Sequence, residues 1–243
     1  MNVILQRNLD GVWASGNGGR GFVQRGGEQY RLCKGLTRLL RRSYRAGAGQ
    51  RIPGAVASGS GWRTESSSRV QGAHVHRVLM HEIMCRARGC QCARAGGVVP
   101  CATPGRFASA CVRAARCFAA ENNLQPLAGE LVLLHPKWPL GTRLDAMYYD
   151  REGRLVLVSW KTGRGARDKR EEHINRVQVA CERALLQLHG VRVFRTCIVQ
   201  LGVAAQRDRE VAYYVCEWLD DTVCGRLYSD LERRFRRRFG EGK

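Results

Sequence analysis

The chain has 243 residues, of which 44% are hydrophobic and 7% aromatic, enough for one domain of ordinary size with a lean core. Its 41 Lys and Arg residues outnumber its 21 Asp and Glu residues, and the formal net charge of +20 favours a polyanionic partner, nucleic acid before an anionic membrane surface. No apolar run approaches the ~20 residues of a membrane-spanning helix, so the pattern excludes a protein integral to a membrane.

The chain contains eleven cysteines, and no secretory signal opens it. This combination predicts a reducing intracellular compartment, with the nucleus and the mitochondrion both compatible, in which thiols are free or bound to metal. Four of these cysteines share a Gly- and Pro-containing segment, but their spacing does not repeat the closely paired cysteines of a structural zinc site; they are Cys85, Cys90, Cys92 and Cys101. Neither zinc nor an iron–sulfur cluster is therefore expected.

Residues 1–65 differ from the rest of the chain in composition, because they are rich in glycine and arginine and contain only two acidic residues before Glu65. The glycine-rich runs 16–21 and 46–49 cannot sustain a helix or a strand. Leucines recur at helical spacing only within 32–44, which predicts one short basic helix. We expect a largely disordered basic extension that can sit on phosphates. A solvated tail without a role and a mitochondrial transit peptide are the alternatives.

Residues 66–243 alternate between helical and strand periodicity and form the predicted folded domain. In chain order, the pattern predicts helices over 71–84 and 106–121, strands over 130–135, 142–149 and 154–160, a helix over 169–188, strands over 191–201 and 211–217, and a final helix over 222–239. Asp150-Arg-Glu-Gly153 reads as a hairpin turn with glycine where positive φ is needed. The fold class is therefore α/β, with a mixed central sheet flanked by helices.

The hairpin of this domain carries the residues that suggest chemistry. Asp145 lies on one strand and Lys161 ends its partner, and cross-strand neighbours lie within ~5 Å of each other. A carboxylate can hold a divalent cation there while an ammonium group polarises water or a scissile phosphate. The pattern alone also fits an ordinary amphipathic hairpin. Two further segments favour the chemical interpretation, namely His76 on the first helix and Gln178 on the helix after the hairpin.

Five segments occur in a fixed order over about residues 66–205: Gly72…His76, Glu130, Gly141-Thr-Arg-Leu-Asp145, Ser159-Trp160-Lys161-Thr162-Gly163 and Gln178. This order resembles the PD-(D/E)XK nuclease superfamily, and within it the RecB-like branch that includes the mitochondrial genome maintenance exonuclease. That branch has Gly-x-x-x-His on a helix, Glu opening a strand, Gly-x-(Ile/Leu)-Asp, a hairpin, Asp-x-Lys-Thr-Gly and a helix bearing Gln. The resemblance implies a restriction-endonuclease-like core.

The resemblance further implies a metal-dependent, exonuclease-type enzyme of DNA replication, repair or recombination that hydrolyses phosphodiester bonds in DNA, single-stranded or at duplex ends. Mg²⁺ or Mn²⁺ is the implied cofactor. Lys161 would align the attacking water or stabilise the pentavalent phosphate, and Gln178 would hold Lys161 or the DNA backbone. The implied catalytic groups are Asp145, Lys161 and Gln178, and the implied metal ligands are His76, Glu130, Asp145 and the backbone carbonyl of Trp160.

The chain departs from the family pattern at Ser159, where the family has the acid that ligates the catalytic metal. A serine hydroxyl is a poor Mg²⁺ ligand, because this hard cation prefers charged oxygen and water. Either another acid, foremost Glu130, supplies the missing ligand, or the protein is a catalytically impaired pseudo-nuclease that binds DNA. A second departure is Glu182, since an aromatic residue often stands four positions after the glutamine.

Basic residues follow the lysine motif and end the chain, and these are the predicted contacts with the DNA backbone: Arg164, Arg167, Lys169, Arg170, Arg233, Arg234 and Arg237. Such contacts give affinity without reading sequence, and they weaken as salt rises. A solvated helix end is the simpler interpretation of the C-terminal run. An RNA- or ribosome-associated basic protein with an accidental hairpin motif is a third interpretation of the whole chain.

Overall fold

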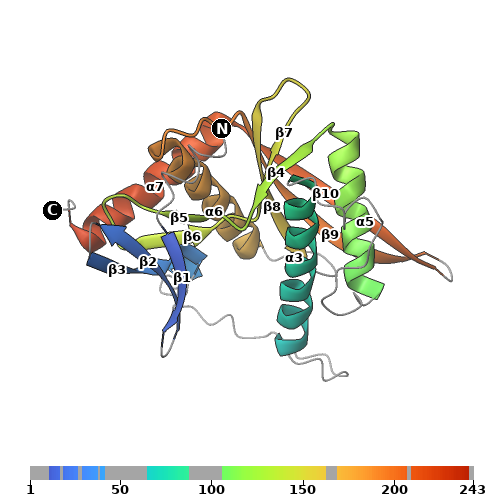
Figure 1. Cartoon of the computed structure of the whole chain (residues 1–243), viewed down its shortest axis with the longest axis horizontal. Coiled ribbons are helices and arrows are strands. Elements are labelled where there is room, and N and C mark those ends of the chain that lie inside the picture. The colour runs from blue at the N-terminus through green and yellow to red at the C-terminus, as the bar shows by residue number, and fades with distance from the viewer. Residues whose placement is uncertain are drawn as a thin grey trace.

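The computed structural model describes residues 11–41, except 17–18, 27–28 and 38, together with 65–87, 106–162, 169–206 and 209–240. Within these residues the chain forms two five-stranded sheets and four long helices (Figure 1). The helices are α3 (Glu65–Ala87), α5 (Arg106–Glu121), α6 (Lys169–Leu188) and α7 (Asp221–Phe239). All four predicted helices of the 66–243 region are thus present. None of the described helices is long and apolar enough to cross a membrane.

The first sheet has the strand order β10-β9-β8-β7-β4 and is mixed, since β8 and β9 run parallel while the other pairs are antiparallel. Helix α6 makes the connection between the two parallel strands, as a parallel pair requires. This confirms the predicted mixed central sheet. The strands are β4 (Gln125–Gly129), β7 (Ala146–Tyr149), β8 (Leu155–Thr162), β9 (Arg195–Gln206) and β10 (Arg209–Leu219).

Helices cover both faces of this sheet. Helices α3 and α5 pack on one face in a cluster with Val156, Val158 and Trp160, whereas α6 and α7 share the opposite cluster with Leu157 (Figure 1). The alternation along β8 follows from the two-residue period of a strand. Ser159, which is fully buried, and Lys161 therefore belong to the face of β8 that α6 covers.

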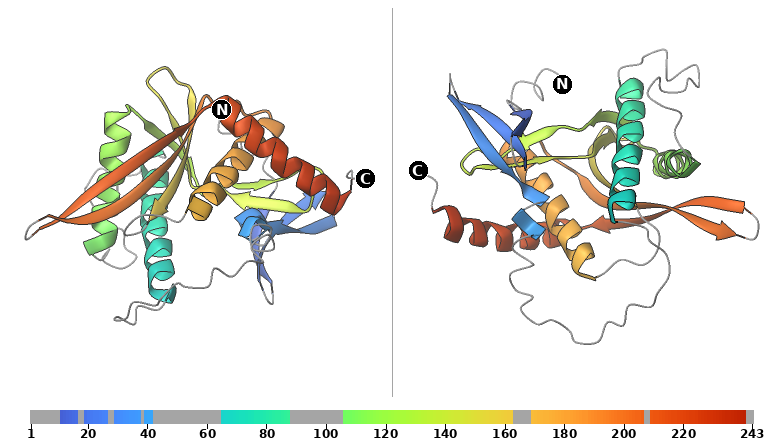
Figure 2. Two further views of the ribbon diagram at one scale, coloured as in Figure 1. Left: turned by 180° about the vertical axis from the view of Figure 1, so that it is seen from behind. Right: turned by 90° about the horizontal axis from the view of Figure 1, so that it is seen from below.

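The second sheet has the strand order β1-β2-β3-β6-β5, and its β3 and β6 are parallel. Its strands are β1 (Gly11–Gly16), β2 (Gly19–Gly26), β3 (Gln29–Gly35), β5 (Val132–Leu134) and β6 (Leu140–Arg143). Figure 2 shows the N-terminal strands beside β5 and β6. The predicted single strand 142–149 is thus divided between two sheets, because the chain leaves β6 after Arg143 and enters β7 at Ala146. Asp145 lies at this crossover.

The predicted strand 130–135 is shorter in the structure, where only β5 lies within it, and β4 before it was not predicted. Glu130 has a positive φ of 53° and separates β4 from β5, which belong to different sheets. The amide N–H of Glu130 donates to the backbone oxygen of Asp145 across 3.2 Å. The two crossovers, at Glu130 and at Asp145, are therefore hydrogen-bonded to each other.

The N-terminal segment differs from its prediction, because strands β1, β2 and β3 occupy part of the glycine-rich region. Asn17-Gly18 separates the paired Gly16 and Gly19, and Asn-Gly is the dipeptide most favoured in two-residue hairpin connections. The predicted helix over 32–44 is shorter than expected, since residues up to Gly35 belong to β3 and the described helical residues lie within 36–41. The rest of the predicted extension lies outside the described residues.

Candidate active site

Asp145 forms the centre of the candidate site. Its Oδ2 atom accepts hydrogen bonds from the backbone N–H of Trp160 at 2.9 Å and from the hydroxyl of Ser159 at 3.0 Å. Its Oδ1 atom lies 3.3 Å from Nδ1 of His76. The crossover between the sheets thus turns the Asp145 carboxylate toward β8 on one side and toward α3 on the other.

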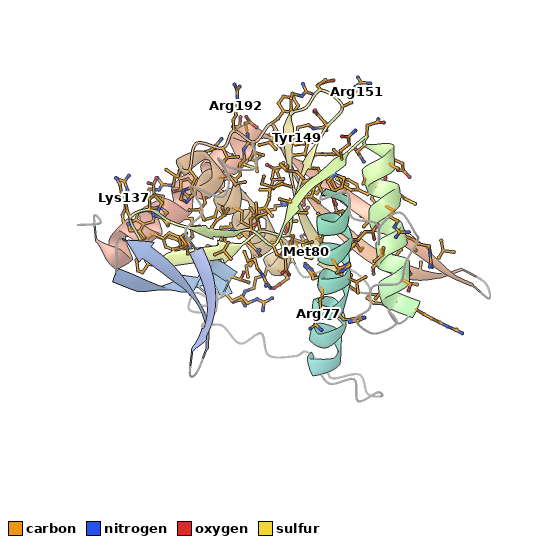
Figure 3. All side chains as sticks on the ribbon, in the orientation of Figure 1. Arg77, Met80, Lys137, Tyr149, Arg151 and Arg192 are labelled. Carbon is orange, nitrogen blue, oxygen red and sulfur yellow. The ribbon has the colours of Figure 1, made fainter. Side chains whose placement is uncertain are left out.

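Helix α3 brings His76 to this carboxylate because it passes very close to the end of β8. A Cβ atom on Gly72 would lie 2.9 Å from Oγ1 of Thr162, so a larger residue at position 72 would require the helix or the Thr162 side chain to shift. His76 follows one turn later on the same side of the helix. At the same interface Met80 lies against the sheet, where a Cβ on Gly129 would be 2.7 Å from its sulfur (Figure 3). The Gly-x-x-x-His spacing therefore has a geometric basis.

Asp145 is an anion throughout the ordinary pH range. Burial by itself would raise the pKa of Asp145, but the charges of His76 and Lys161 and the hydrogen bond from Ser159 lower this pKa to about 2. A carboxylate that accepts several hydrogen bonds beside cationic groups behaves in this way.

A second chain of hydrogen bonds leads from Lys161 into the protein. The Nζ atom of Lys161 donates to Oε1 of Gln178 at 3.4 Å, and Nε2 of Gln178 donates to Oε1 of Glu182 at 2.9 Å. The hydroxyl of Thr142 donates to the same oxygen of Glu182 at 3.1 Å. Glu182 has no exposed surface, and its second oxygen makes no hydrogen bond to the described residues.

Burial raises the pKa of Glu182 to about 7, and the negative charge of Asp145 adds to this rise. Lys161 and the hydrogen bonds from Gln178 and Thr142 oppose the rise but do not cancel it. Two carboxylates in one neighbourhood therefore titrate far apart, with Asp145 the strong acid and Glu182 the weak one.

A cavity of about 500 Å³ opens in front of Asp145 and Lys161. Its walls come from the N-terminal segment, α3, β6, β8 and α6. Its lining combines three cationic side chains and two carboxylates with amides, hydroxyls and an imidazole. The lining residues are Gly35, Leu36, Thr37, Arg41, His76, Thr142, Arg143, Asp145, Trp160, Lys161, Thr162, Glu171, Asn175 and Gln178.

The structure brings most of the predicted catalytic and metal-binding residues together. His76, Asp145, Trp160, Lys161 and Gln178 line the same cavity, and Ser159 contacts Asp145 behind it.

Glu130 is placed differently, because its carboxylate, 41% exposed, lies 3.5 Å from a guanidinium nitrogen of Arg143, and it is not among the described residues that line the cavity. Its assignment as a metal ligand stays a prediction.

Among the predicted DNA contacts, Lys169 and Arg170 begin α6, while the arginines of α7 do not line the cavity; Arg164 and Arg167 lie outside the described residues. Of the four cysteines noted in the sequence, Cys90, Cys92 and Cys101 also lie outside them.

Sequence reasoning missed the roles of Glu182, Thr142 and the N-terminal segment. Glu182 lies one helical turn beyond Gln178, a spacing that allows side-chain contact, and this was the signal that could have identified it.

The described residues offer two donors for a divalent cation, the ionised carboxylate of Asp145 and the imidazole of His76. No group of three or more His, Cys, Asp or Glu side chains within the described ranges is arranged to hold a metal ion. The two donors do not make a self-sufficient metal site. Mg²⁺, however, is commonly bound through one or two carboxylates together with water and the phosphates of a substrate, and the residues present fit that manner of binding.

No family model and no curated protein matches this chain. Among solved structures, it is similar to that of SSO0001, with 16% identity over 67% of this chain and 74% of that chain and a TM-score of 0.28. It is also similar to LHK-Exo, an alkaline exonuclease from Laribacter hongkongensis, with 15% identity over 70% and 93% of the two chains and a TM-score of 0.29. The complex of LHK-Exo with dAMP gives 14% identity over 68% and 94%, with a TM-score of 0.24. Because these scores are low, function is inferred below from the site.

Proposed function

We propose that this protein is a nuclease that binds a DNA strand in the cavity around Asp145 and Lys161 and hydrolyses its phosphodiester bonds with the help of Mg²⁺ or Mn²⁺. The observation that carries the proposal is the meeting of a carboxylate, an ammonium group and an imidazole at one cavity. Asp145 comes from the crossover between the sheets, Lys161 from the end of β8 and His76 from α3. Three separate elements thus converge on one cavity.

Asp145 supplies a fixed negative charge. The hydroxyl of Ser159 and the amide of Trp160 hold its Oδ2 atom, and its low pKa keeps the side chain ionised. When bound, the cation would neutralise phosphate charge and polarise the attacking water, and Asp145 with His76 and the carbonyl of Trp160 would hold it. The exonuclease type of the reaction is the part of the proposal that the family resemblance contributes.

Lys161 supplies the positive charge that faces the substrate. Among the described residues its Nζ atom has one hydrogen-bond partner, Gln178, and an ammonium group can donate three hydrogen bonds. The remaining donors can stabilise the charge that develops on the phosphate, and this stabilisation is stronger in a partly buried site than in water.

Glu182 positions Gln178 for this role. The Oε1 atom of Glu182 accepts from Thr142 and from Gln178, so Gln178 presents its Nε2 donor to Glu182 and its Oε1 acceptor to Lys161. A reversed amide would point an N–H group at the ammonium. Glu182 therefore acts as a positioning residue, one contact removed from Lys161.

A catalytically impaired DNA-binding protein is the second candidate, and Ser159 is the observation that favours it. The hydroxyl of Ser159 occupies an oxygen of Asp145 at the position where the family pattern has a second acid. The site consequently has one negative charge fewer, while Arg41, Arg143 and Lys161 still line the cavity and can bind phosphate.

The test is cleavage of end-labelled single-stranded and duplex DNA by the full-length protein with Mg²⁺, with Mn²⁺ and with a chelator. The proposed nuclease cleaves only with a divalent cation, and Asp145→Asn and Lys161→Ala each lower the rate of cleavage by at least about 10²-fold. Cleavage that persists in both variants would exclude this cavity as the active site. Absence of cleavage, together with DNA binding that Lys161→Ala weakens, would establish the second candidate.

A further inference from the structure

The short N-terminal segment with the described residues 36–37 and 39–41 contributes Leu36, Thr37 and Arg41 to one wall of the candidate active site. It follows β3, which pairs in parallel with β6 through Lys34 with Leu140 and Gly35 with Gly141. Leu36, Leu39 and Leu40 are at most 2% exposed and belong to the same core cluster as residues of α6 and α7. The segment is therefore anchored, and Arg41 at its end is held near the cavity.

Arg41 and Glu171 form an ion pair at this wall. A guanidinium nitrogen of Arg41 lies 3.0 Å from Oε1 of Glu171, which is in the first turn of α6. Both side chains line the cavity, and they are 45% and 41% exposed. An ion pair with this much solvent contact contributes little to stability, because water screens the attraction and the long side chains lose freedom.

We propose that Arg41 is a phosphate-binding residue of a second subsite and that Glu171 competes with the DNA strand for it. This inference rests on the proposed binding of DNA at Asp145 and Lys161, and it adds a contact to another phosphodiester of the same strand. The planar guanidinium group can bind two phosphate oxygens at once, and a charge-assisted pair of this kind is stronger than a single contact. Glu171 holds the guanidinium in the free protein and gives it up when the strand enters.

The cavity has the size that such a second contact requires. Its volume of about 500 Å³ lies inside the range of ligand pockets, about 300–1,000 Å³. Lys161 lies at its β8 wall and Arg41 at its N-terminal wall. A nucleic-acid strand carries one negative charge per nucleotide, so two cationic groups on separate walls can each bind a different phosphate of the same strand.

The interpretation of this ion pair as purely structural and its interpretation as a competitor of DNA predict different effects of two substitutions. If the pair only stabilises the fold, Arg41→Ala and Glu171→Gln remove the same interaction and change DNA affinity in the same direction. If Glu171 competes with phosphate, Arg41→Ala weakens DNA binding while Glu171→Gln strengthens it.

The experiment measures binding of a short fluorescent single-stranded oligonucleotide to the full-length protein by anisotropy, in chelator and at several salt concentrations. We expect Arg41→Ala to raise Kd about fivefold to tenfold, and Arg41→Lys to recover part of this loss. The slope of log K against log salt should fall by about 0.7, the value for one phosphate contact on a single strand. Glu171→Gln is expected to lower Kd by about twofold to fivefold, because it removes the competing charge.

Arg116 and Glu82 provide a matched control, since their side chains pair at 2.6 Å between α5 and α3 and do not line this cavity. Arg116→Ala and Glu82→Gln should each change Kd by less than about twofold. Thermal unfolding by circular dichroism verifies that all variants are folded.

Three results would overturn the inference: a change of Kd in the same direction for Arg41→Ala and Glu171→Gln, an effect of Arg41→Ala no larger than that of Arg116→Ala, or an unchanged salt slope. Lys161→Ala separates this inference from the proposed function. Binding that Lys161→Ala weakens and Arg41→Ala does not would overturn the second subsite alone. Binding that neither substitution changes would overturn the cavity as a DNA site.

Discussion

The hydroxyl of Ser159 donates to Oδ2 of Asp145 across 3.0 Å, from a side chain with no exposed surface. A second acid at this position would place two carboxylates in contact, which like charges resist unless a cation joins them. The serine instead satisfies one oxygen of Asp145 and helps to lower its pKa to about 2. Ser159 therefore avoids the repulsion that a second carboxylate beside Asp145 would introduce.

Ser159→Asp should make the stability of the protein depend on divalent cations. In chelator, the unpaired buried charge is expected to destabilise the fold by about 2–3 kcal/mol, and Mn²⁺ is expected to restore most of this loss. Thermal unfolding with and without Mn²⁺ measures both effects. Ser159→Ala is the matched control, because it removes the hydrogen bond, at a cost of about 1 kcal/mol, without adding charge. An unfolding temperature of Ser159→Asp that does not respond to Mn²⁺ would contradict a cation site at Asp145.

Glu182 should make the protein less stable as the pH rises from about 4.5 to about 7. Burial raises the pKa of Glu182 from 4.5 to about 7, so the folded state holds a proton that the unfolded state has released across this interval. The contribution of this group is fully present below pH 4.5 and is lost as the pH passes 7, and it amounts to on the order of 3 kcal/mol. Asp145 has the opposite effect on stability, and at lower pH. Because its pKa is lowered from 3.8 to about 2, its stabilising contribution is lost as the pH falls through this interval.

Glu182→Gln is the variant that checks this pH dependence. It keeps the shape of the side chain and an acceptor for Gln178 but cannot ionise, so the decline between pH 4.5 and 7 should shrink relative to the wild type. Urea unfolding at pH 5 and pH 8 measures the difference. Glu172→Gln, at an exposed position of the same helix, should leave the wild-type profile unchanged. Equal pH profiles for Glu182→Gln and the wild type would refute the raised pKa.

Lys161→Ala should lower the rate of DNA cleavage by about 10²-fold to 10³-fold, as the loss of one preorganised charge at a reacting group commonly does. Gln178→Ala should lower it by about tenfold, because Lys161 keeps its charge but loses its partner. Single-turnover cleavage with saturating enzyme separates these effects from binding. Lys137→Ala is the control for charge, since this exposed lysine lies on the loop between β5 and β6, away from the cavity (Figure 3). If Lys137→Ala lowers the cleavage rate as much as Lys161→Ala does, the effect comes from the net charge of the protein and not from the position of Lys161.

Leu40→Ala should destabilise the whole protein by about 2–4 kcal/mol, since Leu40 is completely buried in the core cluster. The measurement is chemical unfolding monitored by tryptophan fluorescence. Leu188→Ala on α6 is a suitable control, because its side chain is 50% exposed and the substitution should cost little. If Leu40→Ala unfolds at the same denaturant concentration as the wild type, the segment 36–41 does not belong to the core.

The elements that the sequence predicts best are those whose pattern is local. Helices α5 and α6 begin and end where the periodicity of 106–121 and 169–188 indicates, and Gly153 adopts the positive φ expected of a hairpin turn. The predicted hairpin likewise placed Asp145 near Lys161, whereas the approach of His76 to Asp145 was implied only by the family resemblance, because α3 reaches that carboxylate through tertiary packing.

The features that the sequence did not predict depend on long-range pairing. Apolar alternation continues through Leu144 and Asp145, so nothing local shows that the chain changes sheets there. Glycines in the N-terminal segment suggested an absence of structure, whereas Asn17-Gly18 between alternating residues was the stronger signal. Glu182 was noted only as a departure from a family pattern, because a carboxylate on a helix gives no sign of burial until its tertiary neighbours are known.

The parallel pairing of β3 with β6 has a consequence for biosynthesis. Lys34 and Gly35 leave the ribosome early, but their partners Leu140 and Gly141 are translated only after most of α3 and α5 have been made. The leucines that anchor Arg41 are therefore expected to stay exposed to solvent until β6 has been synthesised. Pairing between segments so far apart in the sequence is slow. Nascent chains in this interval are the species most vulnerable to self-association, so chaperone demand should be concentrated there.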